Sequence, residues 1–375
     1  MDDLTLVAVG DVFLNRDDPD ESFAHVAPLL QADNLTFGNS EGTYATAPQA
    51  DDDMMAAILA APGNIAALAR AGFDVMSVAN NHINDWGRAG MRSTLEGLRQ
   101  AGIRPVGFGR DVDEAFAPTC VTVGDRRIAF VAASMIGSWN AAAQADRDGV
   151  AMLEVATQYH DLHRQPGSPP HVRSQLTEAA AARVARSFQA AARQADFVVG
   201  SFHWGVHCFP AMLAEYEGQL ARLAIDHGAD VILGHHQHIL KGVDFHQGKP
   251  ILHGLGNFAF DLPGIEQIAK PRAVRETIEI HGEYGIFSRD GYPTVPFHEE
   301  SRMTVVAHIG LKQGQVPSVA LTPCLINQQG QPVPIRPAEE AAWARFIVYL
   351  RRIHWLADLH PRIEARGDRI AILPA

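Results

Sequence analysis

Apolar runs alternate along the chain with stretches of helical periodicity. Residues 4–9 form a nearly continuous apolar run that ends at Gly10-Asp11, which is typical of a strand covered on both faces. In three later segments, a helix-like stretch ends at a glycine and a buried strand begins soon afterwards. The glycines are Gly72, Gly102 and Gly228. This alternation of helices and strands predicts a layered α/β domain.

Two pairs of apolar segments have the pattern of β-hairpins. Residues 119–123 precede 127–132, and residues 242–245 precede 249–253, with a short glycine-containing turn in each case. Neighbouring antiparallel strands do not fit one all-parallel, doubly wound sheet. Together with the motifs described below, they favour two sheets.

The alternating pattern extends over residues 1–310, which we predict to be one domain, and it loosens in residues 311–375. This C-terminal extension contains a predicted helix over 337–353 and is expected to pack on the same domain. Residues 138–171 carry small residues, charges and a proline-rich run, and they predict an excursion from the core. Such a segment is either a substrate lid over a site or a surface loop.

Composition narrows the classes of function. The apolar and charged contents, 47% and 20%, are those of a globular protein. The formal net charge of −12 argues against a nucleic-acid partner. The acidic N-terminus does not have the pattern of a signal peptide, and we see no apolar stretch of transmembrane length. Three unpaired cysteines predict reduced thiols, so we expect a cytoplasmic protein with no membrane partner.

Polar residues follow five of the predicted strands. In an open α/β sheet, ligand-binding groups gather beyond the carboxyl ends of the strands. Each group alone has an ordinary explanation as a cap, a turn or a buried histidine, but the five together predict a divalent-metal site. Carboxylate, amide and imidazole ligands fit Mn, Zn, Fe, Ni or Mg without selecting one. The polar groups are Asp11; Asn39 and Glu41; Asn80, Asn81 and His82; His203; and His235, His236, Gln237 and His238.

These groups lie in a series of motifs that resembles the CapA proteins. The CapA proteins are named for poly-γ-glutamate capsule synthesis and belong to the calcineurin-like metallophosphoesterase superfamily. The resemblance covers about residues 4–310. The motifs are Gly10-Asp11, Asn39-Ser40-Glu41, Ala79-Asn80-Asn81-His82-Ile83-Asn84-Asp85-Trp86-Gly87, His203-Trp204-Gly205, Gly234-His235-His236-Gln237-His238 and Leu255-Gly256-Asn257-Phe258.

The resemblance implies a four-layer α/β/β/α sandwich with a metal centre at one edge of the two sheets. It implies Asn81 as a ligand, His82 as an acid/base group, and His236 and His238 as a ligand pair. His235 occupies a variable position of its motif and is left out of the ligand set. The expected metal ligands are Asp11, Glu41, Asn81, His203, His236 and His238.

Three departures from the wider superfamily bear on the chemistry. No histidine follows Asp11 at the first strand, and Glu41 stands in place of a bridging aspartate; CapA-like proteins share both changes. His207 replaces a glutamate of the family motif. These changes argue against a tight two-metal clamp on a phosphoryl group. The absence of the membrane anchor usual in capsule-type members argues against capsule assembly at a cell surface.

Three functions remain open. The first is metal-assisted proton transfer at a peptide Cα, as in the cytosolic branch that resembles lasso-peptide epimerases. Its expected catalytic residues are His82, Asp85 and His207, and its expected substrate contacts are Trp139, His253 and Asn257. The second is metal-dependent hydrolysis of a phosphoester or a γ-glutamyl amide. The third is a non-catalytic accessory protein of polyglutamate synthesis. The expected partner is a peptide or an amino-acid polymer.

Overall fold

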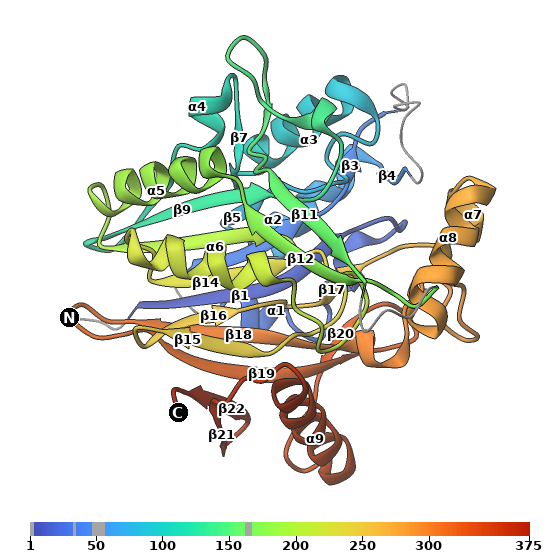
Figure 1. Ribbon diagram of the computed structural model, residues 1–375. Coiled ribbons are helices and arrows are strands. Elements are labelled where there is room, and N and C mark those ends of the chain that lie inside the picture. The colour runs from blue at the N-terminus through green and yellow to red at the C-terminus, as the bar shows by residue number, and fades with distance from the viewer. Residues whose placement is uncertain (1–3, 33–34, 47–56, 162–166) are drawn as a thin grey trace.

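Two β-sheets stacked face to face form the centre of the protein (Figure 1). The computed structural model describes residues 4–32, 35–46, 57–161 and 167–375. The larger sheet has the order β21 (Arg362–Arg366), β22 (Arg369–Leu373), β19 (Ser318–Ile326), β18 (Met303–Leu311), β1 (Leu4–Phe13), β2 (Leu35–Ser40), β5 (Val75–Ser77) and β6 (Arg104–Val106). Two further strands join it, β17 (Asn257–Phe260) beside β1 and β20 (Pro332–Pro334) beside β19.

The second sheet has six strands. Their order is β15 (Val243–His246), β16 (Lys249–Leu252), β14 (Val231–His235), β13 (Phe197–His203), β9 (Arg126–Ser134) and β8 (Thr119–Val123). Strands β8 and β9 pair antiparallel, as do β15 and β16. Both predicted hairpins are therefore confirmed, and so is the prediction of two sheets.

Helices cover the outer faces of both sheets. Helices α5 (Glu178–Ala192) and α6 (Glu215–Asp226) pack on β9, β13 and β14 with their own cluster of buried side chains. Helices α2 (Ile65–Ala71) and α3 (Gly87–Gln100) pack on the larger sheet. The result is the expected α/β/β/α order of layers (Figure 1).

The space between the sheets is filled by apolar side chains. Phe37 of β2 stacks on Phe130 of β9, with ring centroids 5.4 Å apart and an interplanar angle of 4°. Both side chains are fully buried. The two rings come from opposite sheets, so their contact helps to fix the distance between the sheets. That distance determines how closely the polar strand ends of the two sheets approach each other.

The C-terminal residues continue the larger sheet. Strand β18 pairs antiparallel with β1, from Leu4 opposite Leu311 to Ala8 opposite Ala307. The predicted boundary at residue 310 therefore falls inside a strand, because sequence periodicity does not show that a late segment pairs with the first one. Helix α9 (Glu340–Leu356) packs on the same core through four buried residues, Phe346, Tyr349, Leu350 and Ile353.

The remaining elements are short. They are η1 (Pro19–Phe23), α1 (Ala27–Leu30), β3 (Thr43–Tyr44), β4 (Leu59–Ala60), η2 (Pro62–Asn64), β7 (Phe108–Gly109), α4 (Val112–Ala115), η3 (Trp139–Ala141), β10 (Gly149–Val150), β11 (Val155–His160), β12 (His171–Leu176), α7 (Ile265–Ile268), α8 (Pro271–His281), η4 (Gly282–Tyr284) and η5 (Glu299–Arg302). Within the described parts of the chain, no helix combines the length and apolarity needed to cross a bilayer.

The inter-sheet stacking generates a prediction about stability. Phe130→Ala should lower the free energy of unfolding by about 3–5 kcal/mol, because it leaves a cavity beside Phe37 that the two sheets cannot close. Urea denaturation measures this change. Tyr159→Ala, which truncates a side chain that is 70% exposed, is the control and should cost less than about 0.5 kcal/mol. Equal effects of the two substitutions would contradict this account of the core.

Candidate metal centre

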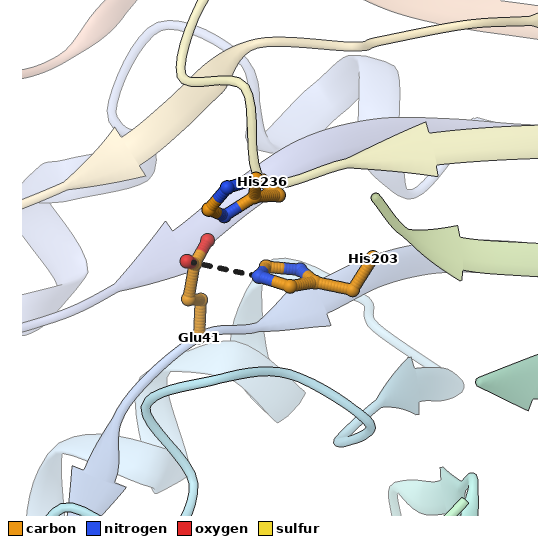
Figure 2. A group of neighbouring side chains, drawn as sticks. All are labelled: Glu41, His203 and His236. Carbon is orange, nitrogen blue, oxygen red and sulfur yellow. Dashed lines mark ion pairs between the residues drawn. The ribbon is translucent and has the colours of Figure 1, made fainter. Parts of the chain in front are cut away.

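The six predicted metal ligands converge where strands of both sheets end. Asp11 lies within β1, Glu41 directly follows β2, and Asn81 lies in the loop between β5 and α3. His203 ends β13, and His236 and His238 follow β14. Figure 2 shows the Glu41 carboxylate reaching toward the rings of His203 and His236, which come from the other sheet.

The ligand atoms form two groups that share Glu41. One group is Glu41, His203 and His236, and the other is Asp11, Glu41 and His238. In each group the donor atoms lie within 4.8 Å of one another. Glu41 Oε1 is 3.4 Å from His203 Nε2 and 3.6 Å from His238 Nε2. Asn81 joins the first group, because its Oδ1 lies 2.6 Å from His203 Nε2.

A set of asparagines holds the carboxylates and one imidazole. Asn39 Nδ2 donates to Asp11 Oδ1 at 2.9 Å, and Asn80 Nδ2 donates to Asn39 Oδ1 at 3.2 Å. Asn257 Oδ1 lies 2.8 Å from His238 Nδ1, which directs Nε2 of that ring toward Glu41. The sequence placed Asn39 and Asn80 at strand ends but did not indicate this supporting role.

The backbone is also constrained around the site. A Cβ at Gly10 would lie 1.9 Å from the carbonyl oxygen of Gly256, so only glycine allows β1 to approach this segment. The Asp11 amide donates to the same carbonyl at 2.9 Å. His236 and His238 have φ values of 92° and 52°, in the left-handed region that non-glycine residues seldom adopt.

Burial controls the protonation of the ligands. Burial alone would raise the pKa of Asp11, but its interactions with His235, His238 and His203 outweigh burial and lower it. The pKa of Glu41 is raised well above its usual value by burial and by the nearby Asp11 carboxylate. Burial lowers the pKa of His203 and His236 far below normal, which keeps both imidazoles neutral. Neutral imidazole is the form that binds a metal.

Unsatisfied buried atoms show that the residues fit a metal ion. Glu41 Oε1 and His236 Nδ1 are buried, and neither has a hydrogen-bond partner. Buried polar atoms without a partner are costly unless an ion or a ligand satisfies them. Oxygen and nitrogen donors in two adjacent groups suit one or two divalent cations. His235 belongs to neither group of donor atoms but lies next to one of them, with its Nδ1 3.5 Å from Asp11 Oδ1.

His82 and Asp85 form a pair beside the ligands. His82 Nδ1 lies 2.8 Å from Asp85 Oδ2, which also accepts from the Ile58 amide at 2.8 Å. Burial lowers the pKa of His82, but the carboxylates of Asp85 and Asp11 together outweigh burial, and the pKa is raised. The His82 side chain is 17% exposed, whereas Asp85 is fully buried. The imidazole can therefore reach a substrate, while the carboxylate orients it.

His207 lies on the side of the centre formed by the smaller sheet. Its ring stacks on His236, with centroids 4.9 Å apart and an interplanar angle of 14°. The centroids of the His238 and His281 rings lie 5.1 Å and 5.4 Å away. The buried ammonium group of Lys241 donates to the carbonyls of Val206 and Met212 and thereby holds the loop that carries His207.

A cavity of about 360 Å³ opens on the ligand cluster. Asn81, His82, His207, His236 and His238 line one side of it. The lining also includes Ile136 and Gly137 and residues of α7 and α8. Nothing in the sequence pattern marks the segment from Leu262 to Ile286 as part of the site. Its isoleucine spacing has the pattern of an ordinary core-facing helix.

The three predicted substrate contacts lie elsewhere. Trp139, which is 56% exposed, lines a neighbouring hollow together with Ile136 and Gly137. The backbone carbonyl of His253 accepts a hydrogen bond from Trp204 Nε1. The imidazole Nδ1 of His253 lies 3.5 Å from Glu217 Oε2, so this buried side chain faces α6. Asn257 is fully buried against His238. Its position gives it a ligand-orienting role instead of a substrate contact.

The proposed lid segment, 138–171, packs beside the cavity instead of lining it in the part that the structure describes. Strand β12, which begins where this segment ends and pairs with β11, packs on the start of α6. There the Ser174 amide donates to Glu215 Oε2 at 3.1 Å. Residues 162–166 lie outside the described chain. The segment that borders the cavity is instead formed by α7 and α8.

Comparison with known proteins identifies a family. The sequence profile described as bacterial capsule synthesis protein PGA_cap matches residues 5–262. The capsule biosynthesis protein CapA of Bacillus anthracis is 27% identical over 269 residues, which are 69% of this chain and 60% of that protein. A Mycobacterium tuberculosis protein named "Probable polyglutamine synthesis accessory protein" is 34% identical over 210 residues, 54% of this chain and 50% of that protein. The chain thus spans between half and two thirds of these relatives.

Solved structures resemble the chain only distantly. The calcineurin-like phosphoesterase YfkN of Bacillus subtilis is 13% identical, with a TM-score of 0.39, and the match covers 94% of this chain and 99% of that one. A Mycoplasma pneumoniae phosphatase is 12% identical, with a TM-score of 0.44, over 85% and 94% of the two chains.

The shared carboxylate generates a prediction about metal content. Glu41→Gln should lower the metal-to-protein ratio more than His236→Ala or His238→Ala, because Glu41 contributes to both ligand groups and each histidine to one. Elemental analysis of purified protein after dialysis against one divalent metal measures this ratio.

Glu276→Gln is the matched control for the removal of a carboxylate. Glu276 lines the same cavity but belongs to neither ligand group, so the metal content should stay unchanged. If Glu41→Gln retained as much metal as Glu276→Gln, the assignment of Glu41 as a shared ligand would be wrong.

Proposed function

The chain belongs to the bacterial capsule synthesis protein PGA_cap family, and we propose that it is a divalent-metal-dependent enzyme that moves a proton at a peptide Cα. Epimerisation requires a base on one face of the reacting carbon and an acid on the other. The observation that carries the proposal is that two imidazoles, His82 and His207, line one cavity but come from opposite sheets.

The ion that the ligand cluster would hold supplies positive charge to stabilise negative charge that develops on a substrate carbonyl oxygen. His82 and His207 would act on the Cα proton from the two sides. Asp85 accepts from Nδ1 of His82 and so leaves Nε2 as the atom that exchanges a proton with substrate. Burial lowers the pKa of His207 well below its normal value, so this ring is a neutral base at pH 7.

A second candidate is hydrolysis of a phosphoester or a γ-glutamyl amide. It is favoured by the sharing of Glu41 between two ligand groups, an arrangement suited to two ions a few ångströms apart. A role as an accessory protein in polyglutamate synthesis is the third candidate, because a Mycobacterium tuberculosis relative carries that name. A cytoplasmic location and a peptide or amino-acid polymer as partner are further predictions.

One experiment separates the three candidates. Metal-loaded protein is incubated in D₂O with a panel of synthetic peptides and with poly-γ-glutamate, and the products are analysed by mass spectrometry. Gain of one deuterium at a Cα without cleavage supports the proposal. Cleavage without deuterium at a Cα replaces the proposal with hydrolysis. Binding of poly-γ-glutamate with neither reaction favours the accessory role.

His82 generates a prediction about turnover. His82→Gln should lower turnover about a hundredfold or more while the metal content stays unchanged, because the substitution removes an acid/base group but no ligand. Deuterium incorporation measures turnover, and elemental analysis measures metal.

His246→Gln is the matched control. His246 forms an ion pair with Asp226 at 2.8 Å, the same separation as between His82 and Asp85, but lies on β15 and lines no part of the cavity. Its substitution should leave turnover intact. Loss of metal from His82→Gln would instead make His82 a residue that positions Asn81, and unchanged turnover would remove it from the mechanism.

A further inference from the structure

We infer that the residue modified by this enzyme has an apolar side chain, and that the apolar part of the cavity lining is the pocket that selects it. This inference rests on the proposed function, because it names the substrate class of the same site. The pocket, called here the apolar wall, consists of Phe260, Leu262, Ile265, Ile268, Ile280 and Ile286.

The position of the apolar wall follows from the fold. Phe260 ends β17, which pairs with β1 beside Asp11. The chain then runs through Leu262 into α7 and α8 and returns at Ile286, so a single segment carries the whole apolar wall. The imidazoles of His236 and His238 line the same cavity. A substrate whose carbonyl oxygen lies at the ligand cluster would therefore place its side chain among aliphatic groups.

The charges around the cavity argue against a polyanionic substrate. Among the described residues that line it, none is a lysine or an arginine, and the carboxylate outside the ligand cluster is Glu276. The whole chain carries a formal charge of −12. Away from the ligand cluster, the carboxylates of a γ-glutamyl polymer would meet no lysine or arginine among these lining residues. Burial of an unpaired charge costs free energy, whereas burial of an apolar side chain contributes favourable free energy for each methylene that leaves water.

Two exposed isoleucines of α8 differ in whether they line the cavity. Ile280 lines the cavity, and its side chain is 63% exposed. Ile278 of the same helix is 56% exposed but does not line the cavity. The two residues therefore differ in position relative to the cavity while sharing residue type, helix and exposure, and they form a matched pair for a test.

The test measures binding and does not depend on the reaction. Alkyl hydroxamic acids bind protein-held divalent metals, so affinities for metal-loaded protein are measured by calorimetry for acetohydroxamate, hexanohydroxamate and a six-carbon hydroxamate that ends in a carboxylate. Hexanohydroxamate should bind about tenfold or more tighter than acetohydroxamate, because four additional methylenes leave water. The carboxylate-ended probe should bind no tighter than acetohydroxamate.

Two variants locate the effect. Ile280→Asp should weaken hexanohydroxamate about tenfold and leave acetohydroxamate unchanged, whereas Ile278→Asp should change neither affinity. Equal binding of the short and long probes, preference for the carboxylate-ended probe, or equal effects of the two variants would overturn the apolar pocket. In those cases acetohydroxamate still binds, and the proposed reaction is judged separately by deuterium incorporation. Failure of every hydroxamate to bind would overturn the pocket and the metal centre together.

Discussion

The architecture depends on two carboxylates that have no contact with water. Asp11 and Glu41 are both fully buried, and each lies within reach of the same histidine, His238. Burial and the neighbouring Asp11 hold the pKa of Glu41 well above its usual value, so both carboxylates can be ionised together only beside compensating positive charge. The buried imidazoles of His203 and His236 are neutral and do not provide it. A bound cation would satisfy this requirement, and the strand ends, the asparagine network and the close approach at Gly10 all position groups around its place.

The two-sheet fold could be predicted from the sequence, and so could the convergence of the polar residues that follow strands of both sheets, six of which stay predicted ligands. Asp11, Glu41, Asn81, His203, His236 and His238 do converge. The cavity wall could not be predicted, since isoleucines in α7 and α8 follow the same periodicity as residues that face a core. The role of Asn257 was also missed, because a motif position does not reveal which neighbour a side chain faces. Segment 138–171 has the composition of a lid, but its described residues line a neighbouring hollow and none of them lines the cavity.

The metal centre and the apolar wall belong to different parts of the chain and can vary independently. The ligands lie on strands and on short loops after them, held by buried hydrogen bonds, whereas the wall is carried by one segment between β17 and β18. Within a family that shares the strand-end motifs, a change confined to this segment would alter the substrate without moving a ligand. Under the proposed function, this separation would let a chain of the family keep the ligand cluster while its cavity differs in the side chain that it admits.

The pairing of β1 with β18 affects the order of folding. Strand β1 supplies Asp11, yet one of its neighbours begins at Met303, so most of the chain must be synthesised before that edge is covered. Contacts between such distant segments form slowly, because the intervening chain must lose conformational entropy before the strands can pair. A nascent chain that ends before Met303 would expose the β1 edge to pairing with other chains. Ribosome-bound intermediates of this protein should therefore require protection from association until the last strands emerge.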